Sequence, residues 1–496
     1  MFESAELGHK LSKGQYQRIE PGLRADLLDA QYELSRNGRF PVVILISGVR
    51  GAGKGETVNL LNEWMDPRHI HTHAFDNPSD EERERPPMWR FWRALPPRGR
   101  IGILFGSWYT APIIDRVFKR TSGKDLLRSI DEINHFEKML ADEDALVLKF
   151  WFHLSKKRQK KRLKALQADR ETSWRVTERD WDFFKHYDRF YRISEETLRR
   201  TSTAHAPWIV IEGSDPEYRA VTVGKTLLEA MRKRLERRVE RRVPKSQAVP
   251  IVRAVDKLHV LQGMDLSLKL ERKAYSKRMR KLQARLAFAT RDPRFLRHNV
   301  VCVFEGMDAA GKGGAIRRIT KALDARLYHT IPVAAPTDEE RAQPYLWRFW
   351  RHVPRKARVT LYDRSWYGRV LVERIEGFCS EADWMCAYCE INDFEEQLAR
   401  NGAVVAKFWL QISKQEQFRR FKEREKTRFK RFKITAEDWR NRRKWDAYQT
   451  TAADMIERTS TAHAPWTLVE ANDKYHARAK ILETLVEAIE AALKRR

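Results

Sequence analysis

The chain repeats itself once, with a constant spacing between matching residues. Lys54 and Lys312 are 258 residues apart (312 − 54 = 258), and the same spacing relates Trp108 to Trp366. The sequence words shared by the two copies are AGKG, DEER, WRFWR, SWY, KFW and TSTAHAPW. Each copy is long enough to bury a hydrophobic core of its own, so the repeat predicts two tandem domains of one fold.

Apolar runs alternate with helical patterns inside each copy. This alternation predicts an α/β fold in which a parallel sheet is flanked by helices, with ligands at the carboxyl ends of the strands. We place the domains at residues 1–230 and 259–496, joined by a basic linker at residues 231–258. Strands are expected in the first copy at residues 42–46, 101–105, 147–152 and 208–212.

A glycine-rich loop follows the apolar run at residues 300–304. It reads EGMDAAGKGG (305–314), and a Gly-x4-Gly-Lys segment that leaves a strand is typical of a phosphate-binding loop, in which Lys312 reaches the outer phosphates. The other residues predicted to bind phosphate in this loop are Gly306, Ala310, Gly311 and Gly313. Gly313 stands where such loops usually carry the Ser or Thr that holds magnesium. Asp308 therefore becomes the candidate metal ligand in the loop.

A second carboxylate follows the strand expected at residues 358–362. Asp363 ends this strand and Arg364 comes directly after it. Sites for nucleoside triphosphates use an acid at the end of a neighbouring strand to hold magnesium, so Asp363 should face the loop that carries Asp308. A lone Asp at a strand end more often caps a helix or a turn. Here it accompanies a phosphate loop with an acid of its own, which favours the metal role.

Cationic side chains cluster in the sequence around this predicted site. Guanidinium groups neutralise the charge on phosphate oxygens during phosphoryl transfer, although surface ion pairing would also explain any one arginine. The helical, basic stretch at residues 417–448 is predicted to form a mobile lid whose cations line a track for a long polyanion. The arginines that we predict to bind phosphate or polyphosphate are Arg369 and Arg374, near Asp363, and Arg420 and Arg424, in the lid.

The charge of the whole chain agrees with this prediction. Lys and Arg number 97 against 68 Asp and Glu, a formal net charge of +29 that implies a polyanionic partner: nucleic acid, an anionic membrane or a phosphate polymer. No apolar run approaches the roughly 20 residues that cross a bilayer, so no membrane partner is expected. Only four cysteines in a chain of 496 residues are typical of a reduced, cytoplasmic protein.

The second copy resembles the polyphosphate kinase 2 family over nearly its full length. The segments that carry the resemblance are GMDAAGKGG, APTDEER, YLWRFWR, YDRSWYGRVLVER, KFWLQISKQEQ and DWRNRRKWDAY. The resemblance implies a P-loop kinase of thymidylate-kinase-like fold that moves the terminal phosphate of polyphosphate to or from a nucleotide with Mg²⁺. It also implies that Asp308 and Asp363 hold the metal, and that Lys312 and Arg364 bind the transferring phosphoryl group. Tandem members of the family favour AMP as the acceptor, so this chain is expected to convert AMP to ADP.

The first copy departs from this pattern where the chemistry is expected. Its phosphate loop, SGVRGAGKGE (47–56), keeps Lys54. The matched residues that differ are Asp308 and Arg50, Asp363 and Phe105, and Arg364 and Gly106. The loss of both carboxylates removes the negative charge that would hold a cation. We therefore expect the first copy to be catalytically inactive and to act in packing, substrate guidance or regulation, with some capacity to bind anions through Lys54.

The leading hypothesis is in-line transfer of phosphate from polyphosphate to AMP at the second copy, without a covalent enzyme intermediate. Alternatives within the enzyme class are a nucleoside diphosphate (ADP or GDP) as the acceptor and ATP as the donor. A protein of another class, which binds nucleic acid or another polyanion and carries a vestigial loop, is disfavoured by the intact Asp308, Lys312 and Asp363, so no dedicated nucleic-acid partner is expected. The sequence leaves open the base preference, the direction of the reaction and a homo-oligomeric state.

Overall fold

The computed structural model describes residues 1–236 and 259–494, and its contacts divide these residues into two compact units. Unit 1 contains residues 1–78, 90–236 and 336–347, and unit 2 contains residues 79–89, 259–335 and 348–494. Of the linker expected at 231–258, residues 231–236 continue a long helix, and the rest lies outside the described residues. The domain boundaries at 230 and 259 stay a prediction.

Each unit is built on a parallel sheet of five strands. In unit 1 the spatial order is β2-β3-β1-β4-β5, with β1 Val42–Gly48, β2 Ile70–Ala74, β3 Ile101–Phe105, β4 Leu146–His153 and β5 Trp208–Glu212. In unit 2 the order is β10-β9-β6-β8-β7, with β6 Asn299–Gly306, β7 Tyr328–Pro332, β8 Val359–Asp363, β9 Ala403–Gln411 and β10 Trp466–Glu470. All the pairings are parallel. The strand order is the same in both units, so the tandem α/β architecture predicted from the repeat is confirmed.

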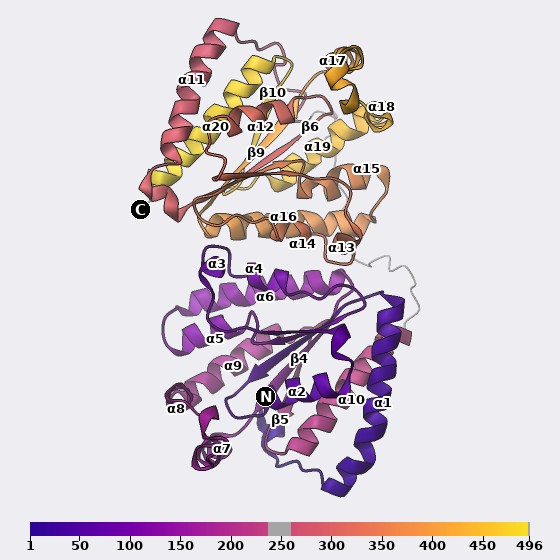
Figure 1. The fold of residues 1–496 in the computed structure, drawn as a ribbon, viewed down its shortest axis with the longest axis vertical. Coiled ribbons are helices and arrows are strands. Elements are labelled where there is room, and N and C mark those ends of the chain that lie inside the picture. Colours follow the sequence, from indigo (N-terminus) through magenta and orange to yellow (C-terminus); the bar gives the residue numbers. More distant parts are fainter. Residues whose placement is uncertain (237–258, 495–496) are drawn as a thin grey trace. The chain divides into compact units, whose positions relative to one another are not determined.

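Helices connect the strands and cover the two faces of each sheet (Figure 1). The α-helices of the first copy are α1 Lys13–Asn37, α2 Lys54–Trp64, α3 Asp80–Arg83, α4 Trp89–Arg93, α5 Thr110–Val117, α6 Gly123–Asp142, α7 Lys156–Ala168, α8 Glu178–Lys185, α9 Tyr187–Thr201 and α10 Pro216–Glu236. Those of the second copy are α11 Arg272–Ala289, α12 Lys312–Thr320, α13 Asp338–Arg341, α14 Trp347–Trp350, α15 Arg374–Glu376, α16 Glu381–Arg400, α17 Lys414–Lys426, α18 Ala436–Arg443, α19 Trp445–Thr459 and α20 Lys474–Lys494. In unit 1, α1, α2 and α10 pack on one face of the sheet and α5, α6 and α9 on the other. In unit 2, α11, α12 and α20 take the first of these places, and α16 and α19 the second.

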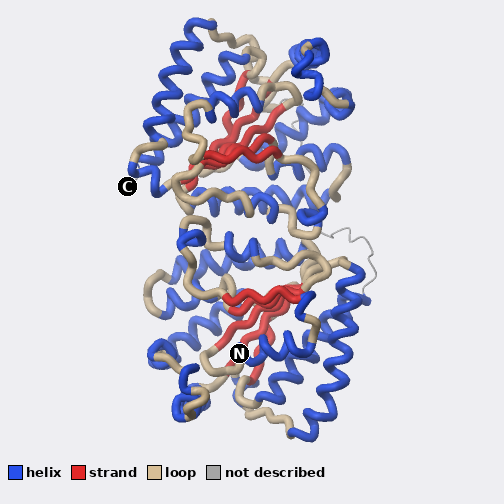
Figure 2. Tube along the Cα trace, in the orientation of Figure 1, coloured by secondary structure: helices blue, strands red, loops and turns tan. Residues whose placement is uncertain are grey.

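The central strand of each sheet is apolar because both of its faces are covered. Six of the seven residues of β1 and seven of the eight residues of β6 are buried. Figure 2 shows the strands gathered inside each unit with helices around them. Since β1 and β6 lie at the centre of their sheets, the phosphate loop that follows each of them opens at the carboxyl edge of the sheet, the usual place for ligands in such folds.

One strand in each unit was not expected from the sequence. β2 and β7 form the edge of their sheets, next to β3 and β8 respectively. Their sequences, IHTHA and YHTIP, place only one residue each in the core, namely Ile70 and Ile331. An edge strand with polar side chains carries no continuous apolar run, which explains why the pattern missed it.

A fully buried ion pair occupies the same place in both units. In unit 2, Lys407 Nζ donates to Glu395 Oε2 at 2.7 Å, to Tyr367 Oη at 2.8 Å and to the carbonyl of Thr459 at 2.6 Å. The matching residues of unit 1, Lys149, Glu137, Tyr109 and Thr201, make the same contacts at 2.7–3.0 Å. Both lysines and both glutamates are fully buried, so each charge depends on its partner.

Candidate active site

The phosphate loop of unit 2 joins the end of β6 to the start of α12. Gly306 has a φ of +140°, and a Cβ there would lie 2.4 Å from the carbonyl oxygen of Leu410, so only glycine fits. Gly311 caps α12 with a φ of +115°, and among the described residues no heavy atom lies within 4 Å of a Cβ built on it. The start of α12 is therefore open at Gly311, and the N-terminus of a helix favours an anion.

Lys312 is the first residue of α12, and its side chain folds back over the loop. Its Nζ donates to the carbonyl oxygen of Gly306 at 2.7 Å. A carbonyl oxygen is a weaker partner for an ammonium group than a phosphate oxygen, which carries a charge. Lys312 was predicted to reach the outer phosphates of a bound chain. Its contact with the Gly306 carbonyl is one that a phosphate oxygen would replace.

Asp308 lies inside the loop with a side chain that is 14% exposed. One carboxylate oxygen, Oδ1, lies 3.4 Å from a guanidinium nitrogen of Arg364, and the other, Oδ2, accepts a hydrogen bond of 2.9 Å from Nδ2 of Asn441. The backbone carbonyl of Asp308 accepts from Gln417 at 3.1 Å. The carboxylate is thus held by one residue that follows β8 and by one residue of α18.

Asp363 ends β8 directly beside the loop. The register pairs it with Phe304 of β6, and a Cβ built on Gly313 would lie 3.6 Å from its Oδ2. The carboxylate therefore approaches the first turn of α12 where a Ser or Thr would otherwise stand. The glycine at position 313 leaves room for this approach, which gives a physical reason for the unusual residue in the loop.

Arg364 holds an unusual backbone conformation between these groups. Its φ is +65°, in the left-handed region that costs a non-glycine residue about 1 kcal/mol or more. Its N–H donates to the carbonyl of Phe304 at 3.1 Å, so the strained residue is tied to the central strand. In unit 1 the matching residue is Gly106, with a φ of +80° that a glycine adopts freely. The strain is therefore kept only where an arginine side chain is presented to the loop.

A third carboxylate, which the sequence did not single out, lies behind the loop. Glu305 is 6% exposed and accepts a hydrogen bond of 2.8 Å from Oγ of Ser365. Burial raises the pKa of Glu305, and the positive charge of Lys312 opposes this rise. Its match in the first copy is Ser47. The absence of this carboxylate from the first copy is visible in the sequence, because Glu305 begins the ten-residue segment that also contains Asp308.

The predicted cationic residues are not equally placed for contact with phosphate. Arg374 pairs with Asp454, donates to Tyr388 at 2.9 Å and stacks over Trp384 at 3.9 Å. Arg369 pairs with Glu373 at 2.9 Å, and Arg424 is half-buried on α17. These contacts resemble the ion pairing that was the alternative explanation for each arginine.

Arg420 is the most buried of the predicted phosphate-binding arginines. Its side chain is 3% exposed, and its guanidinium donates to the carbonyls of Ala309 and Ala310 at 2.9 and 3.0 Å. Further donations reach the carbonyls of Ala471 and Asn472 and the carboxylate of Glu416. These contacts indicate that Arg420 holds the backbone of the phosphate loop in place. They do not favour direct contact between its guanidinium and a polyanion.

The lid of unit 2 consists of α17, the 3-10 helix Arg428–Lys433, and α18, and it leads into α19. Asn441 is not its only contact with the rest of unit 2. Arg440 of α18 and Lys444, which follows α18, both lie close to Glu376, the last residue of α15. Lys444 Nζ donates to Glu376 Oε2 at 2.9 Å, and Arg440 Nε lies 3.6 Å from the same oxygen. The Glu376 side chain is 7% exposed, so this pairing is sheltered from water. The helices expected in the lid are present.

The donor set fits a divalent cation that is shared with a substrate. Among the residues that the structure describes, no group of three or more His, Cys, Asp or Glu side chains could hold a metal by itself. Mg²⁺ is usually bound by one or two carboxylates together with waters and substrate phosphates. Asp308 and Asp363, on either side of the start of α12, offer this number of carboxylates.

The matching site of unit 1 is filled by its own side chains. Arg50 pairs with Asp180 at 3.4 Å and lies 5.0 Å from the ring centre of Phe183. A Cβ built on Gly53, the match of Gly311, would lie 2.1 Å from the guanidinium carbon of Arg219. The start of α2 is therefore covered where the start of α12 is open.

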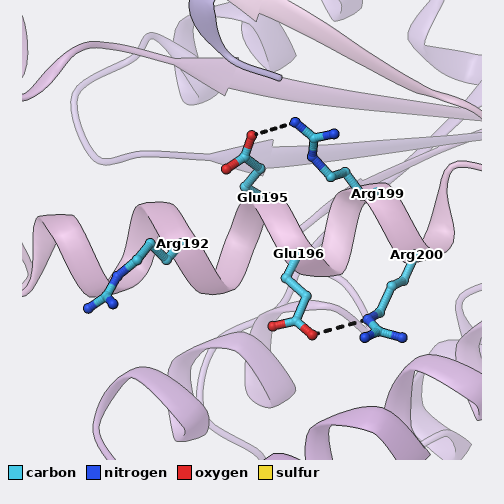
Figure 3. A pocket seen from close by; sticks show the side chains of 5 residues that line it. All are labelled: Arg192, Glu195, Glu196, Arg199 and Arg200. Atoms are coloured by element: carbon cyan, nitrogen blue, oxygen red, sulfur yellow. Dashed lines mark hydrogen bonds and ion pairs between the residues drawn. The ribbon is translucent and has the colours of Figure 1, made fainter.

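Two surface hollows lie in unit 1. One, of about 360 Å³, is lined by side chains of a single helix, α9: Arg192, Glu195, Glu196, Arg199 and Arg200 (Figure 3). Arg199 pairs with Glu195 at 2.9 Å and Arg200 with Glu196 at 3.1 Å, one helical turn apart. The other hollow, of about 250 Å³, is bordered by Glu56 and Arg219 beside α2. Neither hollow is lined by Lys54 or by the glycines of the phosphate loop.

No helix among the described residues is both long enough and apolar enough to cross a membrane.

Comparison with known proteins extends over the whole chain. The profile of the family polyphosphate kinase 2 (PPK2) matches residues 10–239 and again residues 269–496. The polyphosphate:AMP phosphotransferase of Pseudomonas aeruginosa is 58% identical over 495 residues, which cover all of both chains. That of Pseudomonas syringae pv. tomato is 54% identical over all of this chain and 99% of its own. The crystal structure of a polyphosphate kinase 2 from Pseudomonas aeruginosa superposes with a TM-score of 0.91 at 56% identity and covers both chains completely. The chain belongs to the polyphosphate kinase 2 family.

Proposed function

We propose that unit 2 transfers the terminal phosphate of inorganic polyphosphate to AMP and so produces ADP. The observation that carries this proposal is the set of Asp308, Lys312, Asp363 and Arg364 around one phosphate loop. The choice of AMP is supported by the similarity, over the full tandem length, to enzymes named polyphosphate:AMP phosphotransferases.

In the proposed reaction a phosphate oxygen of AMP attacks the terminal phosphorus of polyphosphate. The bond between that phosphorus and its bridging oxygen breaks, and the shortened polyphosphate leaves with the bonding electrons. Such transfers need positioned, charge-neutralising groups more than covalent chemistry by the protein. Lys312 exchanges its contact with the Gly306 carbonyl for a phosphate oxygen, while the N–H groups at the start of α12 hold the same chain. Arg364, held beside Asp308 by its strained backbone, neutralises charge on the transferring group.

We propose Mg²⁺ as the metal, with Asp308 and Asp363 as its protein ligands. When bound, the cation would neutralise charge on the phosphate oxygens and on the two carboxylates. The small number of carboxylates and the open space beside Gly311 support this choice, because Mg²⁺ keeps waters and binds through substrate phosphates. Binding of the metal and of the phosphate chain is therefore expected to be cooperative.

For unit 1 we propose a structural or regulatory role without catalysis. Arg50 and Phe105 stand where the two proposed metal ligands would be, and Arg219 covers the start of α2. The cytoplasm is the expected place of action, in keeping with the few cysteines of the chain.

Two alternative reactions use the same site. A nucleoside diphosphate as the acceptor would give a triphosphate, and ATP as the donor would make the protein an ordinary nucleotide kinase. Both keep the roles proposed for Asp308 and Lys312, so only the substrates discriminate between them. The binding of nucleic acid as the main function is disfavoured because a strand-binding protein needs neither carboxylate.

A single assay series tests the proposal. Purified protein is incubated with Mg²⁺ and either polyphosphate or ATP as the donor, with AMP, ADP, GMP or GDP in parallel, and the products are separated by chromatography. We expect ADP from AMP and polyphosphate, and its loss in Asp363→Asn. The matched control is Phe105→Ala, at the same position of unit 1, which should keep activity close to that of the parent. Full activity in Asp363→Asn would overturn the proposal. So would ADP formation from AMP with ATP as the donor but not with polyphosphate.

A further inference from the structure

The lid of unit 2 holds one of the two carboxylates proposed to bind the metal. Nδ2 of Asn441, on α18, donates to Oδ2 of Asp308 at 2.9 Å, across 133 positions of sequence. A carboxylate only accepts hydrogen bonds, so the amide must present its N–H group to it. The lid is therefore hydrogen-bonded to a carboxylate oxygen that a cation at Asp308 would need.

Only half of the Asn441 amide is used in this contact. Its Oδ1 is buried and has no hydrogen-bond partner among the side chains that the structure describes. The hydroxyl of Tyr448, on α19, is also buried without a partner among them. Burial raises the pKa of Tyr448, and the negative charges of Asp308 and Glu376 raise it further. Unpartnered buried polar atoms are costly, so this group favours a bound species that donates hydrogen bonds.

The same place in unit 1 is closed by different chemistry. Four of the residues of unit 2 that form side-chain contacts between lid and body are Asp308, Glu376, Asn441 and Lys444, and their matches are Arg50, Phe118, Phe183 and His186. The ring of Phe183 lies 5.2 Å from that of Phe118 and 5.0 Å from the Arg50 guanidinium, and Phe118 lies 5.1 Å from His186. Contacts of this kind do not involve a metal ligand, so no cation competes with them.

One contact between loop and lid helix is the same in both units. Gln417 of α17 donates to the carbonyl of Asp308 at 3.1 Å, and Gln159 of α7 donates to the carbonyl of Arg50 at 3.0 Å. The backbone attachment was thus retained when the side chains changed. The side-chain contacts at the matched positions 441 and 183 differ between the two lids.

We propose that Asn441 is a positioning residue that makes closure of the lid depend on what Asp308 binds. The inference rests on the proposed role of Asp308 as a metal carboxylate. Without a cation, the N–H group of Asn441 ties the lid to the free carboxylate. With a hydrated divalent cation at Asp308, the amide turns its carbonyl face to accept hydrogen bonds from water held there. An asparagine has both a donor and an acceptor, so it can close the lid in either state.

Two substitutions separate these halves of the amide. Asn441→Asp keeps an acceptor, but it loses the donor and places a second negative charge against Asp308. Asn441→Leu has a similar size and keeps neither group. Phe183→Leu, at the matched position of unit 1, serves as the control, because that lid is held by apolar and aromatic contacts.

Hydrogen exchange of the lid peptides at residues 414–444 measures the coupling without nucleotide or polyphosphate. In metal-free buffer both variants should exchange at least about tenfold faster than the parent, since a hydrogen bond to a charged group is lost. Millimolar Mg²⁺ should restore protection in Asn441→Asp but not in Asn441→Leu. Phe183→Leu should leave these peptides unchanged, and exchange in β9 should stay the same in every variant if unit 2 remains folded.

Different results would overturn the coupling of the lid to Asp308 and the proposed function. Equal responses of the two Asn441 variants to Mg²⁺, or parent-like exchange in metal-free Asn441→Leu, would overturn the inference. Separate measurement of ADP formation keeps the proposed function apart from it. If the parent makes no ADP from polyphosphate while the exchange pattern holds, the function fails and the lid coupling stands. In the Asn441→Leu enzyme we expect the Mg²⁺ concentration for half-maximal rate to rise by roughly tenfold.

Discussion

The loop that begins at Gly48 and the loop that begins at Gly306 can be compared atom by atom, because they follow the same central strand and precede the same helix. In both, the lysine that opens the helix donates back to the loop: Lys312 to the Gly306 carbonyl at 2.7 Å, and Lys54 to the Gly48 and Val49 carbonyls at 2.8 and 2.7 Å. The backbone of a phosphate loop therefore persists without the residues that would use it.

The difference lies in what faces the start of the helix. In unit 2 no heavy atom of the described residues lies within 4 Å of a Cβ built on Gly311, although a guanidinium nitrogen of Arg478 lies 3.2 Å from a Cβ built on Gly314. In unit 1 Glu56 occupies the first turn of α2, and its carboxylate binds Arg162, Arg175 and Arg219 at distances of 2.6–3.3 Å. The match of Glu56 is Gly314. An internal anion and its arginines thus cover the start of α2, and unit 1 lacks both of the carboxylates that we propose as metal ligands.

The buried Lys–Glu pair marks what the two units still share, and it gives the largest predicted effect. Glu395→Gln leaves the charge of Lys407 without its partner in a dry core, which should reduce the stability of unit 2 by about 3–5 kcal/mol. Glu137→Gln should do the same to unit 1 through Lys149. Hydrogen exchange of β9 and β4 under mild denaturant reports the two units separately.

Replacing both partners by apolar residues, as in Glu395→Leu with Lys407→Met, should cost much less than the single change, because no buried charge is left unpaired. Loss of stability in one unit only would show that the shared network does not have a shared structural role.

The two loop lysines give the next largest effect, and here we expect a different loss of turnover in each unit. Lys312→Ala removes the ammonium group expected to meet the transferring phosphate, so the turnover of AMP to ADP should fall by about 10²–10³-fold. Lys54→Ala should leave turnover within about twofold of the parent. Initial rates with saturating polyphosphate and Mg²⁺ make the comparison.

Comparable losses in both lysine variants would contradict the assignment of catalysis to unit 2 alone. Circular dichroism of each variant checks that the fold survives, since both lysines also bond to their own loops.

The sequence predicted those parts of the molecule that depend on local pattern or on the repeat. Apolar runs located the central strands, and the spacing of 258 residues paired Asp308 with Arg50. The polar edge strands β2 and β7 were missed, because their side chains face water on most sides. A strand whose pairing is set by its neighbour leaves little trace in its own composition.

The site was predicted less completely than the fold. Asp363 was expected to face the loop because carboxyl ends of parallel strands share one edge of the sheet. The contact of Asn441 with Asp308 could not be expected, since it depends on how the lid folds back over 133 residues. Charge was also a poor guide to exposure: Arg420 belongs to a basic stretch, yet it is buried among carbonyl groups. Glu305 could have been found, because its match is a serine.

Glu305 gives a prediction of intermediate size. Its carboxylate accepts a hydrogen bond from the Ser365 hydroxyl and interacts electrostatically with Lys312. It therefore positions the loop against the turn that follows Asp363. Glu305→Gln keeps an acceptor for the hydroxyl but loses the charge, and should lower turnover by roughly tenfold. Glu305→Ala should lower it further.

A smaller loss in Glu305→Ala than in Glu305→Gln would contradict this positioning role, because the hydrogen bond would then have no value. Ser47→Ala, the matched change in unit 1, should have no effect on turnover.

The smallest effect concerns the pH dependence of unit 1. Burial, and to a smaller extent the charge of Arg50, lower the pKa of Lys54 to about 7, against an ordinary value of 10.5 in the unfolded chain. Between these values the unfolded chain binds more protons, so the stability of unit 1 should rise with pH from about 7 upward, and the penalty is fully present below pH 7. The slope contributed by this one group approaches about 1 kcal/mol per pH unit. Lys54→Met should remove it, and Arg50→Gln should move its onset to higher pH, as measured by hydrogen exchange of β4 across the range. An unchanged slope in Lys54→Met would mean that this lysine is solvated, and that the loop of unit 1 is less closed than its contacts with Arg219 and Asp180 imply.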